Sequence, residues 1–69
     1  MANMTPRARR NRKARLLAAF GPFCWYCKKP FTPRELTFEH LIAKAEGGPN
    51  SIWNLRLACY PCNFGRHHP

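Results

Sequence analysis

Two C-x-x-C pairs constrain the fold of this 69-residue chain more than any other feature of its sequence. The pairs are Cys24/Cys27 and Cys59/Cys62, and residues 28–58 lie between them. A chain this short buries too little apolar surface to offset its conformational entropy comfortably, so small domains usually depend on disulfides or a metal. We therefore expect a single domain in which the cysteines supply the missing stability.

The sequence favours a zinc site over disulfides. The early apolar run, residues 16–20, is too short for the hydrophobic part of a secretory signal, and no cleavage site follows it. No stretch is long enough to span a bilayer. In a protein that is not exported, paired C-x-x-C units are typical of zinc thiolate sites. We expect one structural Zn²⁺ bound by all four cysteines, and a cytoplasmic location (the host cytoplasm, if the protein is viral).

The charge balance predicts a polyanionic partner. Twelve lysines and arginines face three glutamates, which gives a net charge of +9. Nucleic acid is the default partner for such an excess, and we expect it to be DNA. Half of the basic residues form one cluster, which we predict to contact phosphates: Arg7, Arg9, Arg10, Arg12, Lys13 and Arg15. A solvated basic tail is the alternative for residues 1–12. A membrane surface is a weaker one, because the cluster is followed by few apolar anchors.

Helix signals mark both ends of residues 5–20. Thr5 suits an N-cap, Pro6 suits the first helical position, and Gly21 followed by Pro22 is a stop. A short apolar stripe at the end of this helix could dock on the rest of the chain. We therefore expect a basic N-terminal helix that precedes the cysteine-bound part.

The remaining local signals predict a ββα unit between and after the cysteine pairs. A cysteine turn at residues 23–30 precedes a strand at 36–42, a loop at 43–52 and a second strand at 55–58. The second cysteine turn leads into a short helix with Pro61 in its first turn. The expected fold class is a small α+β domain stapled by zinc. We expect the aromatic side chains to pack around the metal, namely Trp25, Tyr26 and Trp53.

Several polar residues are not explained by a structural zinc site: Glu39, His40, Asn54 and Asn63. Phosphodiester hydrolysis needs a base that activates water, a cation that stabilises negative charge, and groups that orient both. Histidine is the side chain best suited to take a proton near neutral pH. A glutamate carboxylate is the kind of hard oxygen ligand that Mg²⁺ and Mn²⁺ prefer. The set supplies each part of such a reaction.

The segment F-E-H-L-I-A-K-A-E-G-G-P-N-S-I-W-N-L-R-L-A-C-Y-P-C-N resembles the sequence signature of the HNH endonuclease family. The shared pattern is an acid-histidine pair at a strand end, a Gly-Gly loop, an Asn-Leu pair, and a C-x-x-C followed at once by Asn or His. With the preceding C-W-Y-C, the resemblance covers residues 24–67. It implies a ββα-metal (His-Me finger) nuclease core at 23–69, behind a basic helical arm at 1–22.

The resemblance implies a role for each polar residue. His40 would be the general base that deprotonates the attacking water. Glu39 would be a ligand of the catalytic cation, Mg²⁺ or Mn²⁺. Asn63 would be a second ligand, at the position where many members have histidine. Asn54 would brace the loop and help to orient His40.

Two more roles are implied near the C-terminal end. Arg66 would contact a phosphate, and His67 is a possible third cation ligand because it lies at i+4 from Asn63 on a helix. A solvated or incidental metal-binding histidine is an equal alternative for His67. In a regular strand, Glu39 and His40 would point to opposite faces, although both must reach one phosphate. We therefore expect the strand to end or distort at this pair.

The function implied by the resemblance is metal-dependent hydrolysis or nicking of DNA, which would leave a 5′-phosphate and a 3′-hydroxyl. One ββα unit contacts only a few base pairs, so we expect low sequence specificity unless the protein dimerises or binds a partner protein. Small members of the family are frequent in bacteriophages. Two alternatives stay open. One is a non-catalytic zinc module that binds DNA or RNA, and the other is a zinc-stapled accessory protein of a larger assembly.

Overall fold

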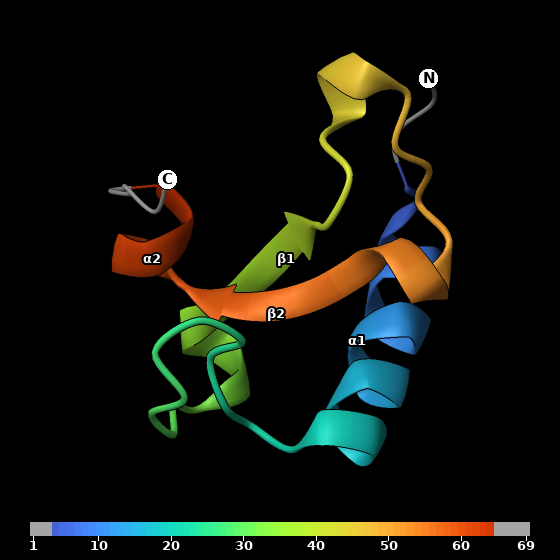
Figure 1. Ribbon diagram of the computed structural model, residues 1–69. Coiled ribbons are helices and arrows are strands. Elements are labelled where there is room, and N and C mark those ends of the chain that lie inside the picture. Colours follow the sequence, from blue (N-terminus) through green and yellow to red (C-terminus); the bar gives the residue numbers. More distant parts are fainter. Residues whose placement is uncertain (1–3, 65–69) are drawn as a thin grey trace.

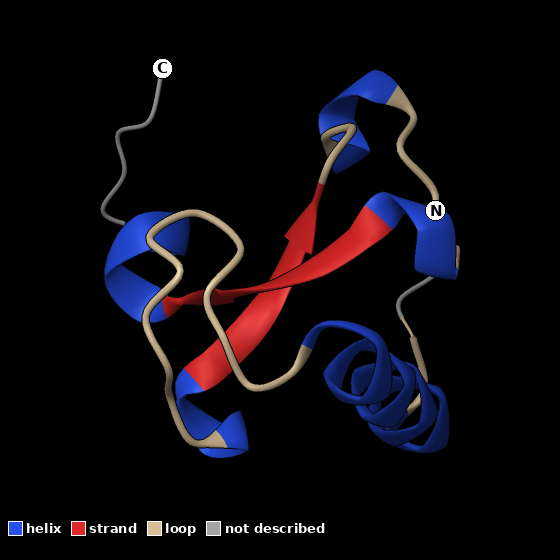
Figure 2. Ribbon diagram, turned by 60° about the horizontal axis from the view of Figure 1, so that its bottom comes forward, coloured by secondary structure: helices blue, strands red, loops and turns tan. Residues whose placement is uncertain are grey.

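The computed structural model describes residues 4–64 and confirms the expected α+β class. Helix α1 (Pro6–Phe20) precedes an antiparallel sheet of two strands, β1 (Leu36–His40) and β2 (Leu55–Cys59), and helix α2 (Tyr60–Phe64) follows directly (Figure 1). Short 3-10 helices lie in the connections, at Pro33–Glu35, Lys44–Glu46 and Ile52–Asn54. The two views place α1 and α2 on opposite sides of the strands (Figure 2). Helix α1 packs on β2 and also reaches β1 through Lys13, whereas α2 packs on both strands.

Helix α1 begins and ends where its capping residues predict. Thr5 is the N-cap, and its Oγ1 accepts a hydrogen bond of 3.1 Å from the backbone N–H of Ala8. Pro6 occupies the first helical position, whose N–H would have no partner within the helix. Gly21 ends the helix with a φ of 80°, a value that favours glycine.

The first strand is two residues shorter than expected. β1 pairs with β2 from Leu36 opposite Cys59 to His40 opposite Leu55, and the predicted extension to Ile42 is wrong. Beyond His40, the backbone N–H of Ile42 donates to the side-chain Oδ1 of Asn54 at 2.7 Å. The Asn54 amide thus takes the place of a further rung of the ladder, and the chain turns away. β2 runs one residue further than predicted because Cys59 pairs with Leu36.

The buried core is small and joins α1, the sheet and the cysteines in one cluster. Its members are Leu16, Cys24, Leu36, Leu55, Leu57, Ala58 and Cys59. Leu16 is the buried residue of α1, so the helix is docked on the sheet by an apolar contact. The expectation that all three aromatic residues near the cysteines are core residues is wrong for Trp53, which is 57% exposed, and for Tyr26, which is 38% exposed. Within residues 4–64, no helix combines the length and apolar character that crossing a membrane requires.

Candidate active site and zinc site

The four cysteines converge into one cluster. Their sulfur atoms all lie within 4.8 Å of one another, and the Sγ atoms of Cys27 and Cys59 are 3.9 Å apart. Tetrahedral Zn–S bonds of about 2.3 Å place neighbouring sulfurs about 3.8 Å apart, so the spacing fits a bound zinc ion. All four cysteines are free of disulfide bonds. The cluster could therefore hold a metal ion such as zinc, as the two C-x-x-C pairs predict.

The backbone around the cluster favours negative charge on one sulfur. Burial opposes ionisation of Cys24, yet N–H donors of Cys27, Cys59 and Tyr26 lower the pKa of its thiol to about 6. The hydrogen bond with Cys59 and burial raise the pKa of Cys62 to about 12. Burial also raises the pKa of Cys59. Negative charge is therefore favoured on Cys24, whereas a metal must displace the protons of Cys59 and Cys62 in order to bind them as thiolates.

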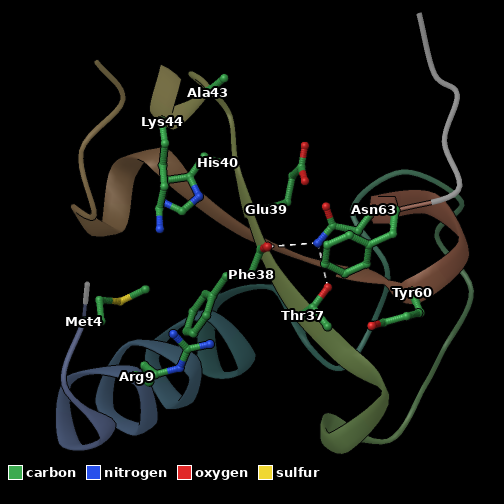
Figure 3. A pocket seen from close by; sticks show the side chains of 11 residues that line it. Met4, Arg9, Thr37, Phe38, Glu39, His40, Ala43, Lys44, Tyr60 and Asn63 are labelled. Atoms are coloured by element: carbon green, nitrogen blue, oxygen red, sulfur yellow. Dashed lines mark hydrogen bonds between the residues drawn. The ribbon is translucent and has the colours of Figure 1, made fainter. Parts of the chain in front are cut away.

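Three of the polar residues line one open groove of about 450 Å³ along the free edge of β1. They are Glu39 and His40 at the end of the strand and Asn63 on α2, and Figure 3 shows their side chains around this groove. Glu39 and His40 lie on opposite sides of the β1 ribbon, as strand geometry requires (Figure 3). Both reach the groove because β1 ends at His40 and, within residues 4–64, no further strand pairs with its outer edge.

A hydrogen bond fixes the tautomer of His40. Its Nε2 lies 2.8 Å from Oδ1 of Asn50, and an amide oxygen can only accept a hydrogen bond. Nε2 therefore carries the hydrogen in the neutral ring, and Nδ1 keeps the lone pair that could take a proton from water. Asn50 is a residue that the sequence marks only as part of a turn, and no sequence signal pairs it with His40.

Asn54 is fully buried and holds the loop between the strands. Its Oδ1 accepts from Ile42 N–H at 2.7 Å, and its Nδ2 donates to the carbonyl oxygens of Ile42 and Pro49 at 3.1 and 2.9 Å. Gly48 completes the turn, because a Cβ there would collide with the carbonyl of Ile42. The hydrogen bonds of Asn54 reach the backbone that follows His40 rather than the imidazole ring.

Asn63 presents a carbonyl oxygen to the groove. Its Nδ2 donates to Oγ1 of Thr37 at 2.7 Å and to the carbonyl of Phe38 at 2.9 Å, which docks α2 against β1. The opposite atom of the amide, Oδ1, is then on the side of Glu39 (Figure 3). A carboxylate and an amide oxygen are hard donors, and this pair fits Mg²⁺ or Mn²⁺ better than a softer cation.

The family model of the HNH endonucleases matches residues 24–68, a segment that contains both cysteine pairs and the whole groove-facing part of β1 and α2. The chain belongs to the HNH endonuclease family. A search of curated proteins finds no match to the chain. Membership indicates nuclease activity, with nucleic acid as the substrate.

In this HNH endonuclease, a contact between Tyr26 and Glu39 was not predicted from the sequence. The hydroxyl of Tyr26 donates a hydrogen bond of 2.8 Å to Oε2 of Glu39. Tyr26 lies between the first two cysteines, 13 residues before Glu39. A C-x-x-C turn carries no signal for such a contact, because the contact depends on how the turn is docked beside β1.

The basic residues of α1 divide between two sides of the helix. Arg9 lines the same groove as His40, and its guanidinium lies 5.6 Å from the ring centroid of Phe38. A separate hollow of about 490 Å³, on the side of Ser51, is lined by three of the predicted phosphate-binding arginines, namely Arg7, Arg12 and Arg15. Arg66 and His67, also predicted as site residues, lie outside the described residues.

Arg10 and Lys13 lie together beside β1. The Nζ of Lys13 donates to the carbonyl oxygen of Leu36 at 2.8 Å, which ties α1 to the start of the strand. Burial, and then the nearby charge of Arg9, lower the pKa of Lys13. This ammonium is therefore engaged by the protein itself.

Proposed function

We propose that this HNH endonuclease hydrolyses DNA phosphodiester bonds, with His40 as general base and one Mg²⁺ or Mn²⁺ held by Glu39 and Asn63. The observation that supports the proposal best is the convergence of these three side chains on one groove at the free edge of β1. A zinc module that only binds nucleic acid would not need a carboxylate, an imidazole and an amide oxygen around the same opening.

The chemistry divides between the residues as follows. Asn50 holds Nε2 of His40, so that Nδ1 accepts the proton of the water that attacks phosphorus. Glu39 and Asn63 supply oxygen ligands beside that position. A bound cation would stabilise the negative charge that develops on the phosphate and on the departing 3′ oxygen. Arg9, which lines the same groove, would neutralise a neighbouring phosphate.

We propose that residues 1–22 act as a basic arm beside a nuclease core at 23–69. The hollow of Arg7, Arg12 and Arg15 would contact the DNA backbone outside the cleavage site, and Arg66 would contact another phosphate. Contacts of this kind are independent of sequence and weaken steeply as salt rises. We therefore expect low sequence specificity for this chain alone, which a second copy or a partner protein would increase.

The decisive experiment is supercoiled-plasmid nicking by the zinc-loaded protein with Mg²⁺, Mn²⁺ or EDTA, in parallel with His40→Ala. The parent should nick with one of the cations and not with EDTA, and the variant should lose at least about 100-fold of this activity, the usual contribution of a general base. DNA affinity should stay unchanged, because the variant keeps every arginine. Zinc content and thermal unfolding of both proteins serve as controls for the fold.

Absence of nicking by the parent with every cation, together with equal DNA binding by both proteins, would refute catalysis. Such a result would leave the zinc module that binds DNA or RNA as the better description.

A further inference from the structure

We propose that Tyr26 is a positioning residue that ties the carboxylate of Glu39 to the cysteine cluster, so that cation binding in the groove depends on the first C-x-x-C turn. The inference rests on the proposed function, because it assigns a determinant of the same catalytic site. Tyr26 connects the two sites with its own atoms. Its backbone N–H donates to Sγ of Cys24 at 3.3 Å, and its hydroxyl donates to Oε2 of Glu39 at 2.8 Å.

The turn that carries Tyr26 is held in place on both sides. The N–H groups of Tyr26 and Cys27 both point at the sulfur of Cys24, and the N–H of Lys28 donates to the Cys24 carbonyl at 3.0 Å. On the other side, the N–H of Trp25 donates to the carbonyl of Leu57 in β2 at 2.8 Å. A bound metal would further immobilise this backbone, because it fixes Cys24 and Cys27. The backbone that carries the Tyr26 side chain is thus held in a fixed position relative to the cysteines and β2.

Glu39 needs such a partner because its own surroundings constrain it little. It stands at the free edge of β1, beside an open groove, and a glutamate side chain loses considerable rotamer entropy when it is fixed. A hydrogen bond from a hydroxyl to a carboxylate is charge-assisted and short. It holds one oxygen of Glu39 while the other stays available to a cation. Loss of such a supporting contact typically weakens metal binding about 10- to 100-fold.

The chain offers a matched control, because it has two tyrosines. Tyr60 lines the groove, and its ring contacts that of Phe64 in a tilted arrangement with centroids 4.6 Å apart. Its hydroxyl points away from Glu39 (Figure 3). The changes Tyr26→Phe and Tyr60→Phe therefore remove the same group, one a hydroxyl bound to Glu39 and the other a hydroxyl of the groove lining, and both keep the aromatic ring.

The test is titration of zinc-loaded protein with Mn²⁺, with the free ion followed by its electron paramagnetic resonance signal. Tyr26→Phe should raise the dissociation constant about 10- to 100-fold, whereas Tyr60→Phe should bind Mn²⁺ like the parent. Glu39→Ala should lose the site. Zinc content and the thermal midpoint, measured on all four proteins, should show that Tyr26→Phe keeps the cysteine cluster and the fold.

The outcomes separate the inference from the proposed function. If Glu39→Ala loses Mn²⁺ but Tyr26→Phe binds it like the parent, the coupling is wrong and the catalytic site stands. An equal loss in Tyr26→Phe and Tyr60→Phe would also overturn the inference, because the effect would then not depend on the contact with Glu39. If Glu39→Ala binds Mn²⁺ like the parent, Glu39 is not a ligand, and the cation site of the proposed function fails together with the inference.

Discussion

The amide of Asn54 is a single side chain on which the whole loop between the strands depends. It satisfies the N–H and the carbonyl of Ile42 and the carbonyl of Pro49 without access to solvent. Each buried group that loses its partner costs about 1 to 3 kcal/mol. We therefore predict that Asn54→Ala lowers the free energy of unfolding by about 3 kcal/mol, measured by urea titration with zinc in excess. Asn11→Ala, at an exposed position of α1, should change it little. Equal stability of the two variants would contradict this role.

Some residues of the candidate site could be predicted from the sequence, whereas the residues that hold them in position by hydrogen bonds could not. Glu39 and His40 belong to the HNH signature, in which several motifs occur in a fixed order, so both residues can be recognised from the sequence alone. Asn50 and Tyr26 look like ordinary turn residues. They reach His40 and Glu39 across 10 and 13 positions, through side-chain geometry that only the folded backbone defines. Positioning residues of this kind therefore need the structure.

At the scale of elements, local signals predicted the limits of α1, whereas the end of β1 followed only from the requirement that Glu39 and His40 reach one phosphate. The ends of α1 are encoded locally, because Thr5 and Gly21 act within one turn of the helix. The end of β1 is set from a distance, because the Asn54 side chain replaces the ladder at Ile42, 12 positions away. The β-forming residues continue to Ile42, so local propensity alone predicts a strand that extends to that residue.

The two sides of α1 should respond differently to loss of charge. Arg12 lines the hollow beside Ser51, whereas the ammonium of Lys13 is bound to the carbonyl of Leu36. Arg12→Ala should weaken DNA binding and lower the slope of log affinity against log salt by about 1, because one phosphate contact is lost. Lys13→Ala should leave that slope nearly unchanged and lower stability by about 1 kcal/mol, since a partly exposed contact to a charged group contributes modestly.

Fluorescence anisotropy with a short duplex at several KCl concentrations measures the slopes, and urea unfolding measures the stabilities. A decrease in slope for Lys13→Ala as large as that for Arg12→Ala would contradict the division of the helix into a DNA side and a sheet side.

At the scale of the whole molecule, a metal bound by the four cysteines would replace the large apolar core that so short a chain cannot build. The buried cluster has seven members, and two of them, Cys24 and Cys59, are themselves cysteines of the site. Removing the ion would therefore loosen the core as well as free the sulfurs. Unbound, the four sulfurs would also bring negative charges together as they ionise. Folding and metal binding should thus form one equilibrium in this chain.

The last prediction follows from this equilibrium and from the protons of the thiols. The pKa of Cys24 is lowered to about 6, but the pKa of Cys62 is raised to about 12, and that of Cys59 is raised as well. Cys59 and Cys62 are therefore protonated at pH 7 in the metal-free protein, and a metal must displace both protons in order to bind these sulfurs as thiolates. Zinc affinity should fall by more than about tenfold per pH unit below pH 7, because more than one proton is released per ion. Competition with a chelator at pH 6, 7 and 8 measures the slope, and circular dichroism of the same samples should show folded structure lost with the ion. A slope near zero, or a metal-free protein as stable as the zinc-loaded one, would show that the apolar core sustains the fold by itself.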